Sequence, residues 1–124
     1  MSNPIPDDIR RFVLTSIASV PHLEALLLLR GDPRAWSTDA VARRLYIADK
    51  NAERLLDDLC RAGMLTAADG TWRYQPASDA MRGMIDDVAR LYAQNLVAMT
   101  NLIHSSVERK AQHFADAFTF RRNS

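Results

Sequence analysis

Residues 37–75 read STDAVARRLYIADKNAERLLDDLCRAGMLTAADGTWRYQ, and this stretch decides the fold. Ser37 is a good N-cap, and the apolar positions after it share one face of a short helix that ends near Tyr46. A second helix is expected from about Asp49 to Ala62, with its core face formed by Ala52, Leu55, Leu56 and Leu59. Gly63 then supplies a left-handed C-cap.

The hydrophobic period changes after Gly63. Residues 64–67 and 71–75 flank a short turn around Asp69 and Gly70, which predicts a β-hairpin. Trp72 and Tyr74 lie two positions apart on the second strand, so we expect both to pack on the core side of it. The predicted order is therefore helix, turn, helix, hairpin.

This order resembles the winged helix-turn-helix of bacterial transcriptional regulators such as the MarR and ArsR families. The agreement lies in residues 40–45 as the first helix, 45–47 as the turn, 55–65 as the end of the second helix, and Asp69 and Gly70 as the wing tip. It covers about a third of the chain. Two positions depart from the pattern: the turn commonly has Gly where this chain has Tyr46, and Ser or a similar cap where it has Ala48, although Asp49 could cap one residue later.

The resemblance implies that the second helix enters the major groove of double-stranded DNA. Lys50, Asn51 and Arg54 would then reach base edges or adjacent phosphates, and the backbone would be held on either side by Arg43, Arg44 and Arg73.

Two acids work against that reading, because Asp49 and Glu53 stand on the same exposed part of the helix. The alternative is a winged-helix module that binds another protein and no DNA. The preferred interpretation is a DNA-binding transcriptional regulator.

The chain after residue 77 is predicted to form one long helix. Starting from the N-cap Ser78, apolar residues recur without a proline to Val107. About 30 residues of helix would extend about 45 Å, well beyond the preceding domain. We therefore expect a homodimer whose seam is formed by Met81, Ile85, Val88, Tyr92, Asn95, Met99 and Leu102. The alternative is a helix folded back on its own domain, broken near Gly83 or near Ser105.

The expected fold class is mainly α-helical with a small β-hairpin. Residues 1–76 form the winged helix-turn-helix domain, including helices that begin after Pro6 and Ser19, and residues 77–124 form the long dimerisation helix and tail. Phe114, Phe118 and Phe120 in the tail are expected to dock on the first helix rather than face solvent.

Composition excludes several classes of protein. A length of 124 residues, 48% of them hydrophobic, allows one core plus an appended element. The net charge of +1 gives no general attraction to polyanions, so a DNA surface depends on how charges are arranged. Cys60 is the only cysteine, and no signal or membrane segment is evident, so a soluble cytoplasmic protein is expected.

No constellation of reactive residues predicts an enzyme, a metal site or a cofactor. His22 stands alone in an apolar helix, and His104 and His113 lack the close ligand spacing of zinc sites. Cys60 and the acid pairs at 57–58 and 86–87 are interpreted as packing and solvated surface. Met81, Met84, Met99 and Tyr92 leave two interpretations, ordinary packing or a site for a small apolar effector, and packing is preferred.

Overall fold

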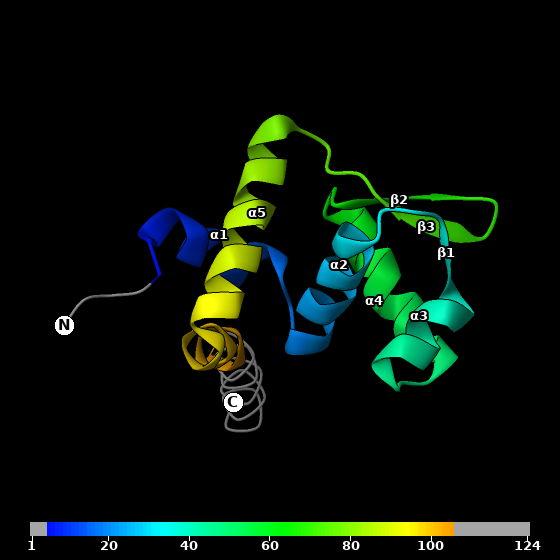
Figure 1. Cartoon of the computed structure of the whole chain (residues 1–124), viewed down its shortest axis with the longest axis horizontal. Helices are drawn as coiled ribbons and strands as arrows, with labels where there is room; N and C mark the ends of the chain where they lie inside the picture. The colour runs from blue at the N-terminus through cyan, green and yellow to red at the C-terminus, as the bar shows by residue number, and fades with distance from the viewer. Residues whose placement is uncertain (1–4, 106–124) are drawn as a thin grey trace, which may run out of the picture.

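The computed structural model describes residues 5–105 of the chain, which are mainly helical with a small three-stranded antiparallel sheet (Figure 1). The helices are α1 (Asp7–Ser16), α2 (Val20–Gly31), α3 (Thr38–Leu45), α4 (Asp49–Arg61) and α5 (Asp79–Gln94), followed by helical residues 96–105. The strands are β1 (Trp36–Ser37), β2 (Leu65–Ala68) and β3 (Thr71–Tyr74).

Serine N-caps begin three of these helices, as the sequence predicts. The side chains of Ser19, Ser37 and Ser78 accept hydrogen bonds from backbone N–H groups three residues further along. Each bond satisfies a donor that the first turn of a helix leaves without a partner, which fixes where the helix starts.

Left-handed residues end α3 and α4. Tyr46 has φ 58° and ψ 45°, and its N–H donates back to the carbonyls of Ala42 and Arg43. Gly63 has φ 85°, and Met64 N–H donates to the Leu59 carbonyl at 3.0 Å, which closes the end of α4. Gly63 therefore caps α4 as predicted, whereas at the α3–α4 turn a tyrosine adopts the conformation that glycine favours.

The sheet has the order β1-β3-β2. The predicted hairpin of β2 and β3 is present, and Asp69 (φ 53°) and Gly70 (φ 76°) form its turn, as expected of a type I′ connection. β1 adds two residues to the other edge of β3 and pairs Trp36 with Trp72. A strand this short has no periodicity of its own, so the sequence predicted only the hairpin.

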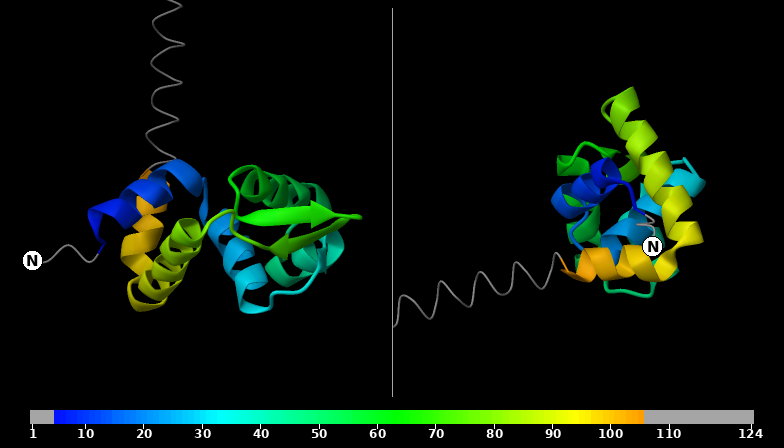
Figure 2. Two further views of the ribbon diagram at one scale, coloured as in Figure 1. Left: turned by 90° about the horizontal axis from the view of Figure 1, so that it is seen from above. Right: turned by 90° about the vertical axis from the view of Figure 1, so that its left-hand side faces the viewer.

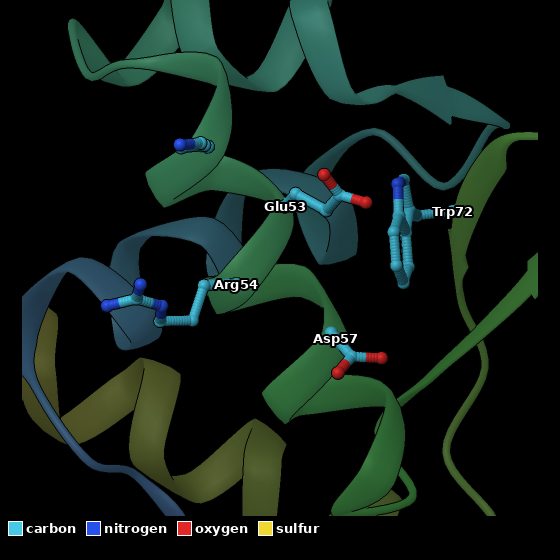
Figure 3. A pocket seen from close by; sticks show the side chains of 5 residues that line it. Glu53, Arg54, Asp57 and Trp72 are labelled. Carbon is cyan, nitrogen blue, oxygen red and sulfur yellow. The ribbon is translucent and has the colours of Figure 1, made fainter.

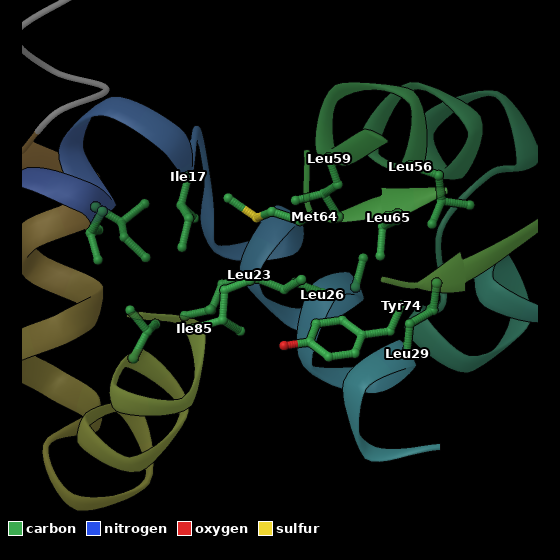
Figure 4. Close-up of a cluster of buried hydrophobic side chains, with 14 of the residues drawn as sticks. Ile17, Leu23, Leu26, Leu29, Leu56, Leu59, Met64, Leu65, Tyr74 and Ile85 are labelled. Carbon is green, nitrogen blue, oxygen red and sulfur yellow. The ribbon is translucent and has the colours of Figure 1, made fainter. Parts of the chain in front are cut away.

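The core runs through α2, which lies between α5 on one side and α3, α4 and the sheet on the other (Figures 1 and 2). Leu23, Leu26 and Leu29 of α2 are fully buried, and they meet residues from α4, the sheet and α5 in one cluster (Figure 4). α1 packs against α5 (Figure 2).

The prediction of one unbroken C-terminal helix was wrong. α5 ends at Gln94, and Asn95 is not helical (φ −136°, ψ 64°). Asn95 N–H donates to the Leu91 carbonyl at 2.7 Å, while its own carbonyl accepts from Met99 N–H at 3.0 Å. Asparagine readily leaves helical backbone and caps the next helix, and the bend lets Met99 and Ile103 reach the core. Within residues 79–105 the helix breaks at Asn95 and not near Gly83; Ser106, the other side of the second expected break point, lies outside the described residues.

Among the described residues, no single helix is both long and apolar enough to cross a membrane. Taken together, α1 and α2 reach that length and composition, with a bend of 104° between them. The predictions for Phe114, Phe118, Phe120 and His113 concern residues outside the described range.

Candidate functional site

The exposed face of α4 carries three of the predicted DNA contacts. Lys50, Asn51 and Arg54 are all exposed, and the opposite face buries Ala52, Leu55, Leu56 and Leu59 as predicted. Within residues 5–105, neither Lys50 nor Arg54 forms an ion pair. Both cations are therefore free to meet an anionic partner.

Glu53 and Asp57 define what we term the hairpin side of α4. Their carboxylates point toward the Trp72 ring on β3 across a cleft of about 370 Å³, which Lys50 and Arg54 also line (Figure 3). The Arg54 guanidinium points away from Trp72 (Figure 3). Asp57 also pairs with Arg61 at 2.8 Å on the exposed surface. The hairpin side is thus acidic, with an aromatic wall opposite.

Trp72 differs from the sequence prediction in part. Tyr74 is buried at 9% exposure, as expected, but Trp72 is only half-buried. The Trp72 indole N–H donates to Thr38 Oγ1 at 3.0 Å, and this bond fixes the position of the ring beside α4. One face of the indole is therefore available to the cleft.

Asn51, Arg54 and Asp58 define the α2 side of α4, which borders the first turn of α2. Asn51 and Arg54 line a second cleft of about 270 Å³ together with Ser19, Pro21, His22, Ile47 and Leu55. The lining of this cleft is mostly apolar, through Pro21, Ile47 and Leu55, and it also carries the Asn51 amide and the Arg54 cation.

His22 connects α2 to α4, a link that the sequence analysis missed. His22 Nε2 lies 2.8 Å from Asp58 Oδ2, and His22 Nδ1 lies 2.6 Å from Ser19 Oγ. Both bonds are satisfied when Nε2–H donates to the carboxylate and the Ser19 hydroxyl donates to Nδ1. The Ser19 oxygen also accepts the His22 backbone N–H as the N-cap of α2. Serine, histidine and aspartate here form a structural bridge, and Asp58 is not merely solvated.

The three arginines predicted to hold the DNA backbone lie on other elements and contact their own chain. Arg43 pairs with Asp39 at 2.6 Å, and the Arg44 guanidinium lies 5.6 Å from the centre of the Trp36 ring. Arg73 on β3 donates to the Pro33 carbonyl at 3.4 Å. All three are exposed, but Arg43 must exchange an intramolecular ion pair to contact phosphate.

The predicted dimer seam faces the interior of its own chain. Ile85, Val88 and Met99 are fully buried, Leu102 is 8% exposed, and the others (Met81, Tyr92 and Asn95) are half-buried. The stripe on α5 covers α1, so these side chains have little surface left for a second subunit. Met81, Met84 and Tyr92 pack against the core.

Two tyrosines have raised pKa values. Burial raises the pKa of Tyr74, with a further contribution from Asp86. Burial also raises the pKa of Tyr92, whose hydroxyl donates to Glu24 at 3.4 Å. Neither lies in the two clefts beside α4. No three His, Cys, Asp or Glu side chains in the described part of the chain lie close enough together to hold a metal ion.

Neither a protein-family model nor a curated protein sequence matches the chain. A solved structure, the S-adenosylmethionine-dependent methyltransferase SibL in its apo form, is similar to part of it, with a TM-score of 0.46 and 23% sequence identity. The similarity covers 73% of this chain and 26% of the methyltransferase, so the chain spans about a quarter of that protein. A likeness at this level assigns no activity to the chain.

Proposed function

We propose that the segment from α2 to β3 is a winged helix-turn-helix that binds double-stranded DNA, within a cytoplasmic regulator of transcription. The observation that carries the proposal is the surface formed by Lys50, Asn51 and Arg54 at the start of α4. A helix presented in this way fits the major groove, where Arg and Lys recognise guanine and Asn recognises adenine. The left-handed turn at Tyr46 and the hairpin beyond α4 have the order that the resemblance requires.

The binding mode follows from where the cations stand. Asn51 and Arg54 on the α2 side contact base edges, while Arg44 and Arg73 contact phosphates beside α4. Glu53 and Asp57 face the hairpin, and their repulsion of phosphate lowers the affinity that the cations provide. Because the net charge is only +1, nonspecific binding should be weak and should fade as salt rises.

Fluorescence anisotropy with genomic DNA fragments, at low and at physiological salt, tests the proposal. Asn51→Ala should cost on the order of 1–3 kcal/mol on the preferred fragment and little on others. Arg73→Ala should weaken binding to all fragments and lower the salt slope by about one. Arg90→Ala, an exposed cation on α5, is the matched control and should bind normally. Failure of the wild-type protein to bind any fragment at low salt would contradict the proposal.

A homodimer remains part of the proposal, with half-sites roughly 10 bp apart. Its interface must be sought outside the buried stripe of α5, and Leu96 and Val97 (54% and 69% exposed) offer apolar surface next to the break at Asn95. Sedimentation equilibrium of the wild-type protein and of Val97→Asp tests this. A wild-type monomer at concentrations on the order of 10 μM would reject a dimer strong enough to matter for binding.

The second candidate is a protein-interaction module, and the hairpin side of α4 favours it. Two carboxylates beside the α4 surface repel phosphate, and they would have no such cost against a protein partner. A stable complex with a cellular protein, together with absence of DNA binding at low salt, would favour this candidate over the regulator.

A further inference from the structure

The cleft on the hairpin side of α4 has two unlike walls. The Trp72 indole forms one wall, held by its bond to Thr38, and the Glu53 and Asp57 carboxylates form the other (Figure 3). In the described part of the chain, no cation lies over the Trp72 ring. Lys50 and Arg54 also line the cleft, but the Arg54 guanidinium points away from Trp72 (Figure 3), and Arg61 pairs with Asp57 at Oδ2. An aromatic face and carboxylates both attract cations, so the space between Trp72, Glu53 and the other Asp57 oxygen suits a positive group.

The same combination is filled elsewhere in this chain. Arg34 stacks on the other tryptophan, Trp36, with its guanidinium carbon 3.9 Å from the ring centre. Its Nε is 2.9 Å from a carboxylate oxygen of Asp32. The Arg34 guanidinium is thus stacked on the Trp36 indole and paired with the Asp32 carboxylate at the same time.

The two tryptophans are direct neighbours. Trp36 on β1 pairs with Trp72 on β3, and residues paired in this way project from the same face of a sheet. Trp72 therefore presents an indole beside carboxylates, as Trp36 does. No guanidinium from the described residues stacks on Trp72, whereas Arg34 stacks on Trp36. The cleft of about 370 Å³ has room for it.

We propose that this cleft binds an arginine side chain of a protein partner. The planar guanidinium stacks on the free face of Trp72 while its N–H groups donate to Glu53 and to Asp57 Oδ1, because Arg61 pairs with Asp57 Oδ2. Lysine would fit less well, because its ammonium is compact and cannot make two parallel bonds to a carboxylate. DNA offers no cation and would bring phosphates toward the two acids. The inference goes beyond DNA binding and does not require it.

The test uses two peptides that differ only in charge, acetyl-Gly-Arg-Gly-amide and the same peptide with neutral citrulline in place of arginine. Because the chain has two tryptophans, a ¹H–¹⁵N spectrum shows two indole signals, and Trp72→Phe identifies the one from Trp72. The arginine peptide should shift the Trp72 signal with a Kd on the order of 10 mM, as expected for a single side chain. The Trp36 signal and the citrulline titration should remain almost unchanged.

Two variants that remove the same charge separate a built site from general attraction. Glu53→Gln should raise the Kd for the arginine peptide about threefold. Asp69→Asn, at the tip of the hairpin and outside the cleft, should leave the Kd unchanged, and asparagine tolerates its positive φ.

Equal shifts with the arginine and citrulline peptides would overturn the inference. So would equal weakening by Glu53→Gln and Asp69→Asn, or no movement of the Trp72 signal up to several times the expected Kd. DNA binding is measured separately, so its failure leaves this result standing.

Discussion

The two sides of α4 share one helix and the same solvent exposure, yet they differ in charge and in attachment. On the α2 side, Asp58 is bonded to the buried His22, and Arg54 is left free. On the hairpin side, Glu53 and Asp57 face Trp72 across an open cleft. Asp58 is thus bonded to a neighbouring helix, whereas Glu53 forms no ion pair within residues 5–105 and Asp57 pairs only with the exposed Arg61 of its own helix.

A helix of mixed charge can present a usable cation when its acids point in different directions. Asp57 and Asp58 are adjacent in sequence, and an α-helix separates adjacent side chains by about 100°. One carboxylate is thereby directed to His22 and the other to the cleft. Of the acids on α4, Asp58 is therefore bonded to His22, while Glu53 and Asp57 are directed toward the hairpin.

The largest expected effect contrasts these two aspartates. Asp58→Ala should lower the free energy of unfolding by about 2 kcal/mol, because it leaves the buried His22 Nε2–H without its acceptor. Asp57→Ala should change it by about 0.5 kcal/mol or less, since the pair with Arg61 is exposed. Urea denaturation measures both.

The adjacent position makes Asp57→Ala a close control, because both variants gain the same helix propensity of alanine. Equal losses in the two variants would mean that the His22 bridge does not distinguish the two sides. A larger loss for Asp57→Ala would reverse the comparison.

A smaller effect is expected beneath the hairpin side, at Tyr74 of β3. The Tyr74 hydroxyl is buried and forms no hydrogen bond of good geometry with the described residues, although the Arg30 side chain lies near it. Tyr74→Phe removes the cost of burying that group and should raise the free energy of unfolding by about 1 kcal/mol. The Trp72 indole signal should stay in place, because the change lies under the strand and not in the cleft.

The pH dependence of stability follows from the same burial. Because burial raises the pKa of Tyr74 in the folded chain, the unfolded chain loses its proton first as the pH rises past the ordinary value of 10.0. The stabilising contribution is complete below that value and is lost as the pH rises through the raised pKa. The melting temperature should therefore fall less steeply with increasing pH above 10 for Tyr74→Phe than for the wild-type protein. An identical slope would argue against this origin.

The smallest expected effect concerns the turn that orients α4. Tyr46 is 94% exposed and left-handed, so it pays conformational strain without gaining packing. Tyr46→Gly should raise the free energy of unfolding by about 0.5 kcal/mol, after the greater freedom of glycine in the unfolded chain is subtracted. Ala93→Gly, at an exposed helical position of α5, should instead lower it by a similar amount. The same sign for both variants would contradict the strain argument.

Much of the fold could be predicted because its signals are local. Ser37, Gly63 and the turn at Asp69 and Gly70 each determine backbone within a few residues, and each was placed correctly. The hydrophobic period also identified the buried face of α4.

The remaining features depend on distant partners. The His22–Asp58 bond joins residues 36 positions apart, and only the Ser19 cap three residues before His22 hinted at a second bond to the imidazole. The break at Asn95 arises because the core accepts Met99 and Ile103, which periodicity alone cannot reveal. The facing walls of the Trp72 cleft likewise require the packing of β3 beside α4.

The most direct test of the account is the affinity for DNA of two variants at neighbouring positions, Arg54→Ala and Glu53→Gln, measured by fluorescence anisotropy against the fragment that binds the wild-type protein best. The account predicts opposite signs. Arg54→Ala should weaken binding about tenfold, because it removes one of the two cations of α4, Lys50 and Arg54, that form no ion pair within residues 5–105. Glu53→Gln should strengthen it about threefold at low salt, because it removes a carboxylate that repels phosphate. Changes of the same sign, or no change in either variant, would contradict the assignment of α4 as the DNA-binding helix.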